Sequence, residues 1–553
     1  RHELEALFPL ICIRLCITVV NAALQRKVNP ENEYLSISEK PAWALLEKFA
    51  AVDPGYALYT FRHACDLPPC PVTQDVAAWL DKNRDKAADV LDMNPAGSKK
   101  IVFDFSIQSL QLGNIPDVQD MDRLTDRLFS CMSGENAVVG IGRYNEARLF
   151  YTTDIFKALG DNGPQWRTIH LGIDLFQKAG APVFAPFDGV VHSFRINDNA
   201  LDYGPAIVLQ HSPEKGITFY TLYGHLGKES LEGLAEGRMV KKGERIGSIG
   251  AMSENGGWPP HVHFQIISDM LGKKGDFPGV ALPDEREVWL SLCPDPNLIL
   301  GLPTELFRDD RLTQEQILGM RQERIGRNLS ISYTKPLTIV RGYMQHLYDV
   351  NGRSYLDCVN IVPHVGHCHP HVVKAGASQM AVLNTNSRYL HENMIRYAQR
   401  LCSKLPKQLS VCYFVCSGSE ANELALRLAR TRTKSRETIV LDGAYHGNTS
   451  SLIDISPYKH DGPGGFGPPP YVHKIPTPDV FRGCYRRDDP MAGHKYAEHA
   501  AAVITQIEQG GSRVSAFICE PFLSCAGQIV LPAGYLKEVY AHIRKAGGVC
   551  IAD

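Results

Sequence analysis

The chain has 553 residues, of which 44% are hydrophobic and 21% charged, and this length is more than one hydrophobic core can serve. We therefore expect three or four globular domains. The formal net charge of −2 gives no electrostatic reason to expect nucleic acid or a membrane surface as a partner. The 15 cysteines are scattered without paired zinc-type spacing, which suits a reducing compartment and favours a cytoplasmic location.

Residues 1–55 are predicted to form a helical tail. Apolar residues recur near helical spacing in ALFPLICIRLCITVVNAAL, and Ser38 is placed to cap a second apolar run. Pro9 and Arg14 interrupt the first run, so it favours a buried amphipathic helix over a bilayer-spanning one. The segment resembles the C-terminal lobe of aminoglycoside phosphotransferase-like kinases. It lacks a kinase catalytic loop and a metal-binding aspartate, so we expect no phosphotransfer from it.

Two further segments follow the helical tail. Residues 56–150 combine a turn at CDLPPCP with an expected strand at KKIVFDFS, and no chemistry can be assigned to them, so we expect a mixed linking module. Over residues 151–290, short apolar runs are separated by glycine and proline. This texture is typical of an antiparallel β domain.

Polar residues that can bind a metal stand on three of the expected strands of the β domain. His170 and Asp174 have an even separation, so in an extended segment their side chains emerge on one face, as do those of His261 and His263 in HVHF. His225 ends the strand FYTLYGHL. Two imidazoles and one carboxylate form an open zinc ligand set, which leaves the fourth position for a water whose pKa the metal lowers. The remaining histidines can move protons or stabilise an oxyanion.

The stretches HLGIDLF, LYGHL, VKKGERIGSIG and PPHVHFQI together resemble the lysostaphin-like zinc endopeptidases, which cut peptide bonds in bacterial cell walls. The resemblance implies that His170, Asp174 and His263 hold zinc. It also implies that His261 acts as a base and that His225 assists the transition state. A histidine in a β core is more often a structural residue, so a non-catalytic binding insert stays open as an alternative. Another alternative makes the zinc endopeptidase the only active unit of the chain.

Over residues 291–553, helix and strand patterns alternate, which favours an α/β domain. In YFVCSGSEANELALRLARTRT, an apolar strand leads into Ser417 and Glu420, which open a helix. Small residues at a helix N-terminus expose backbone N–H groups to a phosphate. The same S-x-x-E spacing fits an ordinary capping box, so both interpretations stay open.

Three residues near expected strand ends in this domain can bind an aromatic cofactor. Tyr445 can stack on a flat ring, Glu520 ends a strand, and Asp553 can pair with a protonated pyridine nitrogen. Together with three further stretches, these residues resemble the fold-type I pyridoxal-phosphate enzymes of the class-III aminotransferase family, in particular its ethanolamine-phosphate phospho-lyase branch. The stretches are NIVPHVGHCHPHVV, NTNSRYLHENM and SCAGQIVLPAGYL. The resemblance implies that Gly418 and Ser419 bind the cofactor phosphate, that Tyr445 stacks on the ring with Glu520 nearby, and that Asp553 contacts the ring nitrogen.

This second resemblance runs from about residue 310 to the last residue. It implies a small-molecule amine or phospho-amine substrate and a homodimer in the intact protein, and it leaves transamination and phosphate elimination both open. In this family the Schiff-base lysine follows the aspartate at which the sequence stops. We therefore expect an incomplete domain whose own lysines form no stable internal aldimine. The sequence thus predicts a fragment of a multifunctional enzyme: a kinase-like helical tail, a zinc-peptidase-like β domain that acts on a peptide, and an α/β pyridoxal-phosphate domain.

Overall fold

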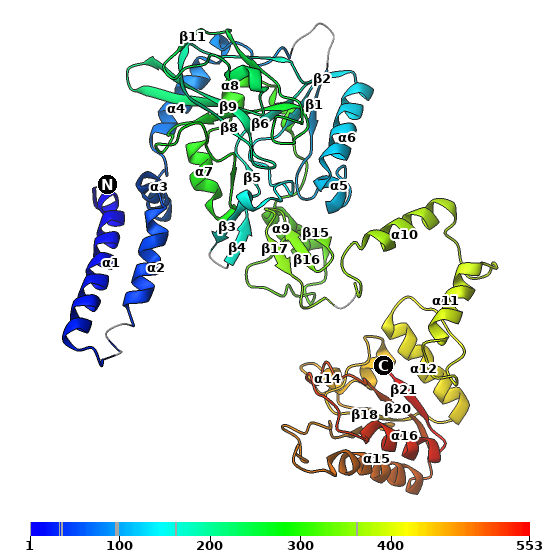
Figure 1. The fold of residues 1–553 in the computed structure, drawn as a ribbon. Coiled ribbons are helices and arrows are strands. Elements are labelled where there is room, and N and C mark those ends of the chain that lie inside the picture. The colour runs from blue at the N-terminus through cyan, green and yellow to red at the C-terminus, as the bar shows by residue number, and fades with distance from the viewer. Residues whose placement is uncertain (1, 33, 35–36, 94–98, 161–162, 361–362) are drawn as a thin grey trace. The chain divides into compact units, whose positions relative to one another are not determined.

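The computed structural model describes residues 2–553 except 33, 35–36, 94–98, 161–162 and 361–362 (Figure 1). The chain divides into two compact units, Arg1–Asn384 and Thr385–Asp553. The multidomain prediction is confirmed.

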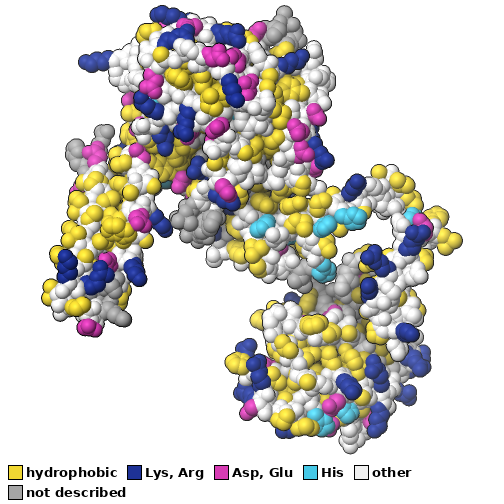
Figure 2. Space-filling model, viewed as in Figure 1, with side chains coloured by type: hydrophobic (Ala, Val, Ile, Leu, Met, Phe, Trp, Pro, Cys, Tyr) yellow, Lys and Arg dark blue, Asp and Glu magenta, His cyan; other side chains and the backbone are white. Residues whose placement is uncertain are grey.

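The chain begins with the helices α1 (His2–Val28), α2 (Glu39–Ala50) and α3 (Pro54–Ala64). The rings of Phe8 and Phe49 join α1 to α2 at 5.5 Å between centroids. On α1, Val19 and Ala22 are buried, whereas a second set of apolar side chains is exposed. Apolar atoms gather on the surface of the N-terminal helices in Figure 2. The exposed residues are Leu7, Leu10, Ile13, Ile17, Val20, Leu24 and Val28.

The structure differs here from the expected buried amphipathic helix, because α2 and α3 cover only one side of α1. The helix is continuous, with Pro9 inside it. Over Glu3–Val28 its hydropathy reaches 2.1, so it is long and apolar enough to cross a membrane by length and composition alone. Core helices of soluble proteins and signal sequences meet the same test.

The core of the first unit is an eight-stranded sheet. Only β1 and β2 pair in parallel, and every other pair in this sheet is antiparallel. In sheet order the strands are β1 (Lys99–Phe103), β2 (Ala137–Gly142), β6 (Ile173–Phe176), β13 (His261–Ile267), β10 (Ile217–Gly224), β9 (Gly204–Glu214), β8 (Gly189–Asn197) and β11 (Met239–Val240). The antiparallel β architecture agrees with the sequence pattern.

The first two strands belong to the segment that we expected to be a separate linking module, 56–150. They instead extend the sheet, since β2 pairs with β6 through Ile141 and Leu175, both fully buried. The helices α5 (Ile115–Gln119) and α6 (Met121–Gly134) connect β1 to β2, and α4 (Val72–Lys82) packs on β10. Residues 99–142 are therefore part of the β domain's core.

Short elements surround this sheet. The paired strands are β3 (Lys157–Gly160) with β4 (Gly163–Trp166), β5 (Ile169–His170) with β14 (Val280–Ala281), and β7 (Pro182–Phe184) with β12 (Arg245–Ser248). The helices are η2 (Arg84–Lys86), η3 (Asp154–Phe156), η4 (Lys228–Leu231), η5 (Pro283–Glu285), α7 (Arg286–Leu292), α8 (Asn297–Leu300) and η6 (Thr304–Phe307).

The first unit continues past the expected boundary at residue 290. It includes α9 (Gln314–Arg324), a sheet of β15 (Ile339–Tyr343), β16 (His346–Asp349) and β17 (Ser354–Leu356), and α10 (Pro370–Val382). Arg341 on β15 donates hydrogen bonds to the carbonyl oxygens of Ile107, Ser109 and Gly113. These bonds attach the three-stranded sheet to the β domain.

The second unit is an α/β layer structure with a parallel sheet. In sheet order its strands are β19 (Val472–Ile475), β18 (Glu437–Leu441), β20 (Val514–Cys519) and β21 (Val549–Ala552). Buried residues of α15 and α16 cover one face of the sheet, and those of α12 and α13 cover the other. The elements are α11 (Glu392–Cys402), α12 (Gly418–Thr433), β18 (Glu437–Leu441), α13 (Ser450–Asp454), α14 (Pro457–His460), β19 (Val472–Ile475), α15 (Ala492–Gln509), β20 (Val514–Cys519), α16 (Tyr535–Lys545) and β21 (Val549–Ala552). This part of the chain has the expected α/β architecture.

A buried histidine in the β sheet makes the stability of the first unit depend on pH. His211 is fully buried, with Nδ1 3.0 Å from the carbonyl oxygen of Asp188 and Nε2 2.8 Å from Thr221 Oγ1. Burial lowers the pKa of His211 to about 4. Between about pH 6.5 and about pH 4, His211 therefore binds a proton in the unfolded chain but not in the folded protein. The folded state has its full stability above the unfolded pKa of about 6.5 and loses part of it as the pH falls toward about 4.

We expect the free energy of unfolding to fall by about 2 kcal/mol more in the native protein than in His211→Gln between about pH 7 and about pH 5. Urea unfolding followed by tryptophan fluorescence measures this, because all 5 tryptophans lie in the first unit. Equal losses in the two proteins would contradict the prediction.

Candidate functional site

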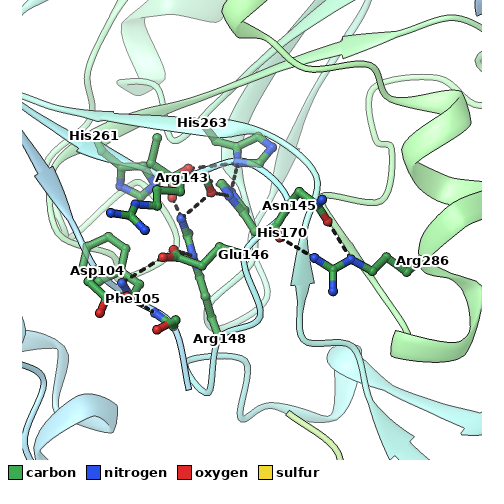
Figure 3. Close-up of polar contacts among 12 residues, drawn as sticks. Asp104, Phe105, Arg143, Asn145, Glu146, Arg148, His170, His261, His263 and Arg286 are labelled. Carbon is green, nitrogen blue, oxygen red and sulfur yellow. Dashed lines mark hydrogen bonds and ion pairs between the residues drawn. The ribbon is translucent and has the colours of Figure 1, made fainter. Parts of the chain in front are cut away.

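Three side chains that could hold a metal ion meet where β5, β6 and β13 come together (Figure 3). His170 ends β5, Asp174 lies on β6, and His263 faces Asp174 directly across the antiparallel pair of β6 and β13. His170 Nε2 lies 3.0 Å from His263 Nδ1, and each of these nitrogens lies 3.1 Å from Asp174 Oδ1. All three side chains are buried.

The donor set fits a zinc ion. Zinc binds histidine nitrogen and carboxylate oxygen at about 2.0–2.2 Å, which places tetrahedral donors about 3.4 Å apart. The three donor atoms need to separate by only a few tenths of an ångström to reach that spacing. Two histidines and one carboxylate also leave one coordination position for water or substrate.

The outer atoms of the two histidine ligands are already engaged. His170 Nδ1 donates to the carbonyl oxygen of Arg143 at 2.9 Å, and His263 Nε2 donates to Gln265 Oε1 at 2.9 Å. The Gln265 amide donates in turn to the carbonyl oxygen of Pro278, which fixes its orientation. These bonds leave a lone pair on His170 Nε2 and on His263 Nδ1, so they select the tautomers that a metal needs.

A buried arginine holds the aspartate ligand. Arg148 Nη1 lies 2.6 Å from Asp174 Oδ2, and Arg148 Nε lies 2.9 Å from Glu146 Oε2. Burial raises the pKa of Asp174, but the neighbouring His170 imidazole and the Arg148 guanidinium outweigh this effect and hold that pKa well below its usual value. Burial raises the pKa of Glu146 to about 7 in spite of Arg148. The sequence pattern gave no local signal for Arg148 or Glu146.

His225 and His261 lie beside the three ligands, with ring centroids 4.3 Å apart. His261 Nε2 is 3.7 Å from Asp174 Oδ1. Nδ1 of His225 donates to the carbonyl oxygen of Asn255, and Nδ1 of His261 donates to that of Pro259. Burial lowers the pKa of both imidazoles, so both are neutral near pH 7 and present Nε2 as a proton acceptor.

The glycine of HLGID has a steric role. A Cβ at Gly172 would lie 2.6 Å from the His263 ring and 2.8 Å from the carbonyl oxygen of Phe264. His263 therefore occupies the space that any side chain at residue 172 would need. The structure thus brings together all five residues predicted for the metal site, and Gly172 allows the strands that carry them to approach.

The second candidate site lies at the carboxyl edge of the parallel sheet. The strands β18, β20 and β21 run in the same direction, so their carboxyl ends share one edge. Tyr445, Glu520 and Asp553 follow these three ends in turn. Ligands of open parallel sheets bind at this edge.

The carboxylate of Asp553 is held firmly at this edge. Asn422 on α12 donates to Asp553 Oδ1 at 2.8 Å, and His446 Nδ1 lies 2.7 Å from Asp553 Oδ2. Asn422 also donates to the carbonyl oxygen of His446. A carboxylate fixed in this way fits the protonated nitrogen of a pyridine ring. Asn422 and His446 were not among the predicted site residues, although each is adjacent to a predicted segment.

The start of α12 joins the same edge. Ser419 Oγ accepts a hydrogen bond from the backbone N–H of Asn448, in the loop that carries the half-buried Tyr445. Gly418 is exposed at the helix N-terminus. Glu520 accepts from the backbone N–H of Ser524 and so caps the loop after β20. An exposed helix N-terminus fits a phosphate, and Glu520 is engaged within its own loop.

Two family models match parts of the chain. Residues 168–274 match Peptidase family M23. Residues 330–553 match Aminotransferase class-III. The chain therefore joins an M23 peptidase-like domain to a region similar to class-III aminotransferases, as both sequence resemblances predicted. Neither match includes residues 1–55, so the kinase resemblance stays a prediction.

Relatives named as aminotransferases and phospho-lyases also match part of this chain. An alanine–glyoxylate aminotransferase 2-like protein of Drosophila melanogaster is 48% identical over 252 residues, which are 45% of this chain and 51% of that protein. Ethanolamine-phosphate phospho-lyase homolog 1 of Caenorhabditis elegans is 38% identical over 261 residues, or 45% and 56% of the two chains. A phospholyase structure from Arthrobacter in complex with phosphoethanolamine is 37% identical, covers 43% and 55%, and has a TM-score of 0.40. The chain thus spans about half the length of these relatives.

Arg148 supplies the positive charge that lets Asp174 be buried without a metal. We expect Arg148→Met to destabilise the first unit by about 3–5 kcal/mol in the presence of a chelator, because two buried carboxylates lose their cation. Zinc should restore part of this loss, since the ion supplies positive charge beside Asp174. Urea unfolding with chelator and with zinc measures both effects.

The control is Arg195→Met, on an exposed position of β8, which should change stability by less than about 0.5 kcal/mol. A loss below about 1 kcal/mol for Arg148→Met in chelator would contradict the charge-compensating role of Arg148.

Proposed function

We propose that the first unit binds zinc through His170, Asp174 and His263 and hydrolyses a peptide or amide bond. The observation that carries this proposal is the triangle of donor atoms at 3.0–3.1 Å with two neutral histidines beside it. Bound zinc would polarise a carbonyl oxygen and lower the pKa of a water molecule. The match to Peptidase family M23 supports the same reaction class.

The two neutral histidines have complementary steps in this hydrolysis. His261 Nε2 is the proton acceptor nearer the ligand carboxylate, at 3.7 Å from Asp174 Oδ1, and it takes a proton from the attacking water. His225 Nε2 lies in the same ring pair. Once protonated, an Nε2–H of either ring can stabilise the developing oxyanion or pass the proton to the leaving nitrogen.

Metal content separates zinc binding from catalysis. We expect about one zinc per native chain and none in His263→Ala, whereas His261→Ala should keep its zinc and lose about 100- to 10,000-fold in kcat on a peptide. Elemental analysis and a cleavage assay measure these changes.

The matched control is His192→Ala, a half-buried histidine on β8 outside the ligand group. Its zinc content and activity should equal those of the native protein. Zinc retained in His263→Ala, or absent from the native chain, would refute the assignment of the ligands.

We further propose that the second unit binds pyridoxal phosphate at its carboxyl edge and that the intact protein acts on a small amine or phospho-amine. The fixed Asp553 carboxylate supports this, and the Caenorhabditis elegans relative is named as a phospho-lyase homolog. Pyridoxal phosphate would supply an electron sink for bonds to the amine carbon. Transamination and phosphate elimination are both compatible with these residues. A homodimer, a cytoplasmic location and the absence of an internal aldimine stay predictions.

The charge of Asp553 should decide cofactor retention. We expect Asp553→Asn to raise the Kd for pyridoxal phosphate about 10- to 100-fold, since a charge-assisted hydrogen bond to the ring nitrogen is lost. Equilibrium dialysis measures the Kd. The control is Glu508→Gln, near the end of α15 and before the amino end of β20, which should bind pyridoxal phosphate with the native Kd. Equal affinities in all three proteins would exclude Asp553 from the cofactor site.

A further inference from the structure

The candidate metal centre opens into a cavity of about 350 Å³ whose lining lies partly outside the M23 match. His170, Asp174, His225, His261 and His263 contribute to the lining. One wall of the cavity comes from the preceding segment of the chain: Leu124, Leu128, Phe150, Tyr151, Ile155 and Phe156. The segment expected to be a linking module therefore shapes the candidate active site.

This wall packs into the sheet rather than resting on its surface. The Tyr151 ring lies 6.1 Å from the Trp258 ring, and the Phe105 ring lies 5.8 Å from the Phe176 ring, each pair edge to face. Leu124, Leu128 and Phe150 share one buried apolar cluster with Phe176 and Trp258. This wall of the cavity is thus made of fixed apolar side chains. The cavity volume is at the lower end of the range for small-ligand pockets.

Two buried hydrogen-bond donors line this cavity without a partner. Tyr203 is 8% exposed and Trp258 is 7% exposed, and neither Tyr203 Oη nor Trp258 Nε1 makes a hydrogen bond within the described part of the chain. The Tyr203 ring is 5.3 Å from the His263 ring, and the Trp258 ring is 6.0 Å from the His225 ring. Because buried polar groups are nearly always paired, these two donors indicate where acceptor oxygens of a substrate bind.

Charges of both signs also line this small cavity. Arg167 is half-buried, and its guanidinium has no ion pair or hydrogen bond to any residue that the structure describes. Lys273 adds a second cation, and Asp202 and Asp276 add two carboxylates. A molecule with an ammonium and a carboxylate close together matches this set. In a long peptide the two charged ends lie far from an internal bond.

We propose that the metal site hydrolyses short zwitterionic peptides of about dipeptide size with an apolar side chain. This inference rests on the proposed hydrolytic function. The apolar side chain packs on the wall, the C-terminal carboxylate pairs with Arg167, and Tyr203 and Trp258 donate to the peptide's oxygens. The water oxygen forms a bond to the carbonyl carbon, the C–N bond breaks, and a proton from the water moves through histidine to the leaving nitrogen.

The test compares three substrates on the zinc-loaded native chain: leucyl-phenylalanine, the same dipeptide acetylated and amidated at its ends, and a nine-residue peptide with that bond at its centre. We expect kcat/KM to be at least about tenfold higher for the free dipeptide, because only that molecule pairs both charged ends. Hydrolysis of the blocked or long peptide at an equal or higher rate would overturn the inference and leave the proposed function standing. No hydrolysis of any of the three would overturn both.

Two variants test the residues directly. Arg167→Gln should raise KM for the free dipeptide about tenfold with kcat unchanged, and should leave the amidated dipeptide unaffected. Phe156→Ala should increase kcat/KM for the nine-residue peptide, because it removes part of the wall. Arg327→Gln, an exposed arginine after α9, is the control for both. An Arg167→Gln effect of equal size on the free and amidated dipeptides would overturn the carboxylate contact.

Discussion

The cross-strand pairing of Asp174 with His263 is the constraint on which the first unit depends. Facing residues of an antiparallel pair share one side of the sheet, and a slip of one residue would turn a ligand to the other side. The register therefore has to hold through the whole β6–β13 pair. Leu175 and Val262, which face each other and are fully buried, help to fix it through apolar packing. The chemistry of the site is thus secured by the same packing that forms the core.

This register places a carboxylate inside the protein, and that carboxylate needs a positive charge. Arg148 supplies it from a segment next to β2, and β2 reaches the site because Gly142 pairs with Asp174. A buried charge without a partner is strongly destabilising, so the burial of Asp174 depends on the segment after β2 that carries Arg148. Once the extension is present, the residues that follow it are positioned to wall the cavity. Charge compensation at Asp174 and the apolar wall of the cavity therefore arise from one segment.

The sequence was informative where the signal is local. The spacing of His170 and Asp174 and of His261 and His263 follows from the period of a strand, so these residues could be assigned to one face before the fold was known. Arg148 could not be assigned, because its partner Asp174 is 26 residues away and no periodic pattern joins them. The donors in the cavity wall are similar cases, since they are recognised only by their lack of a partner in the folded chain. The pairing of β2 with β6, beyond residue 150, is likewise a long-range contact that no local pattern of the sequence indicates.

In the second unit, the two interpretations of the S-x-x-E spacing are compatible. Ser417 Oγ accepts from the backbone N–H of Glu420, and the Glu420 carboxylate accepts from the backbone N–H of Cys416, which is the bonding of a helix cap. These bonds do not involve the N–H groups of Gly418 and Ser419, the two positions implied for phosphate binding. The cap fixes the first turn of α12 and leaves those two N–H groups free to bind an anion. Capping and the proposed phosphate binding therefore do not compete for the same groups.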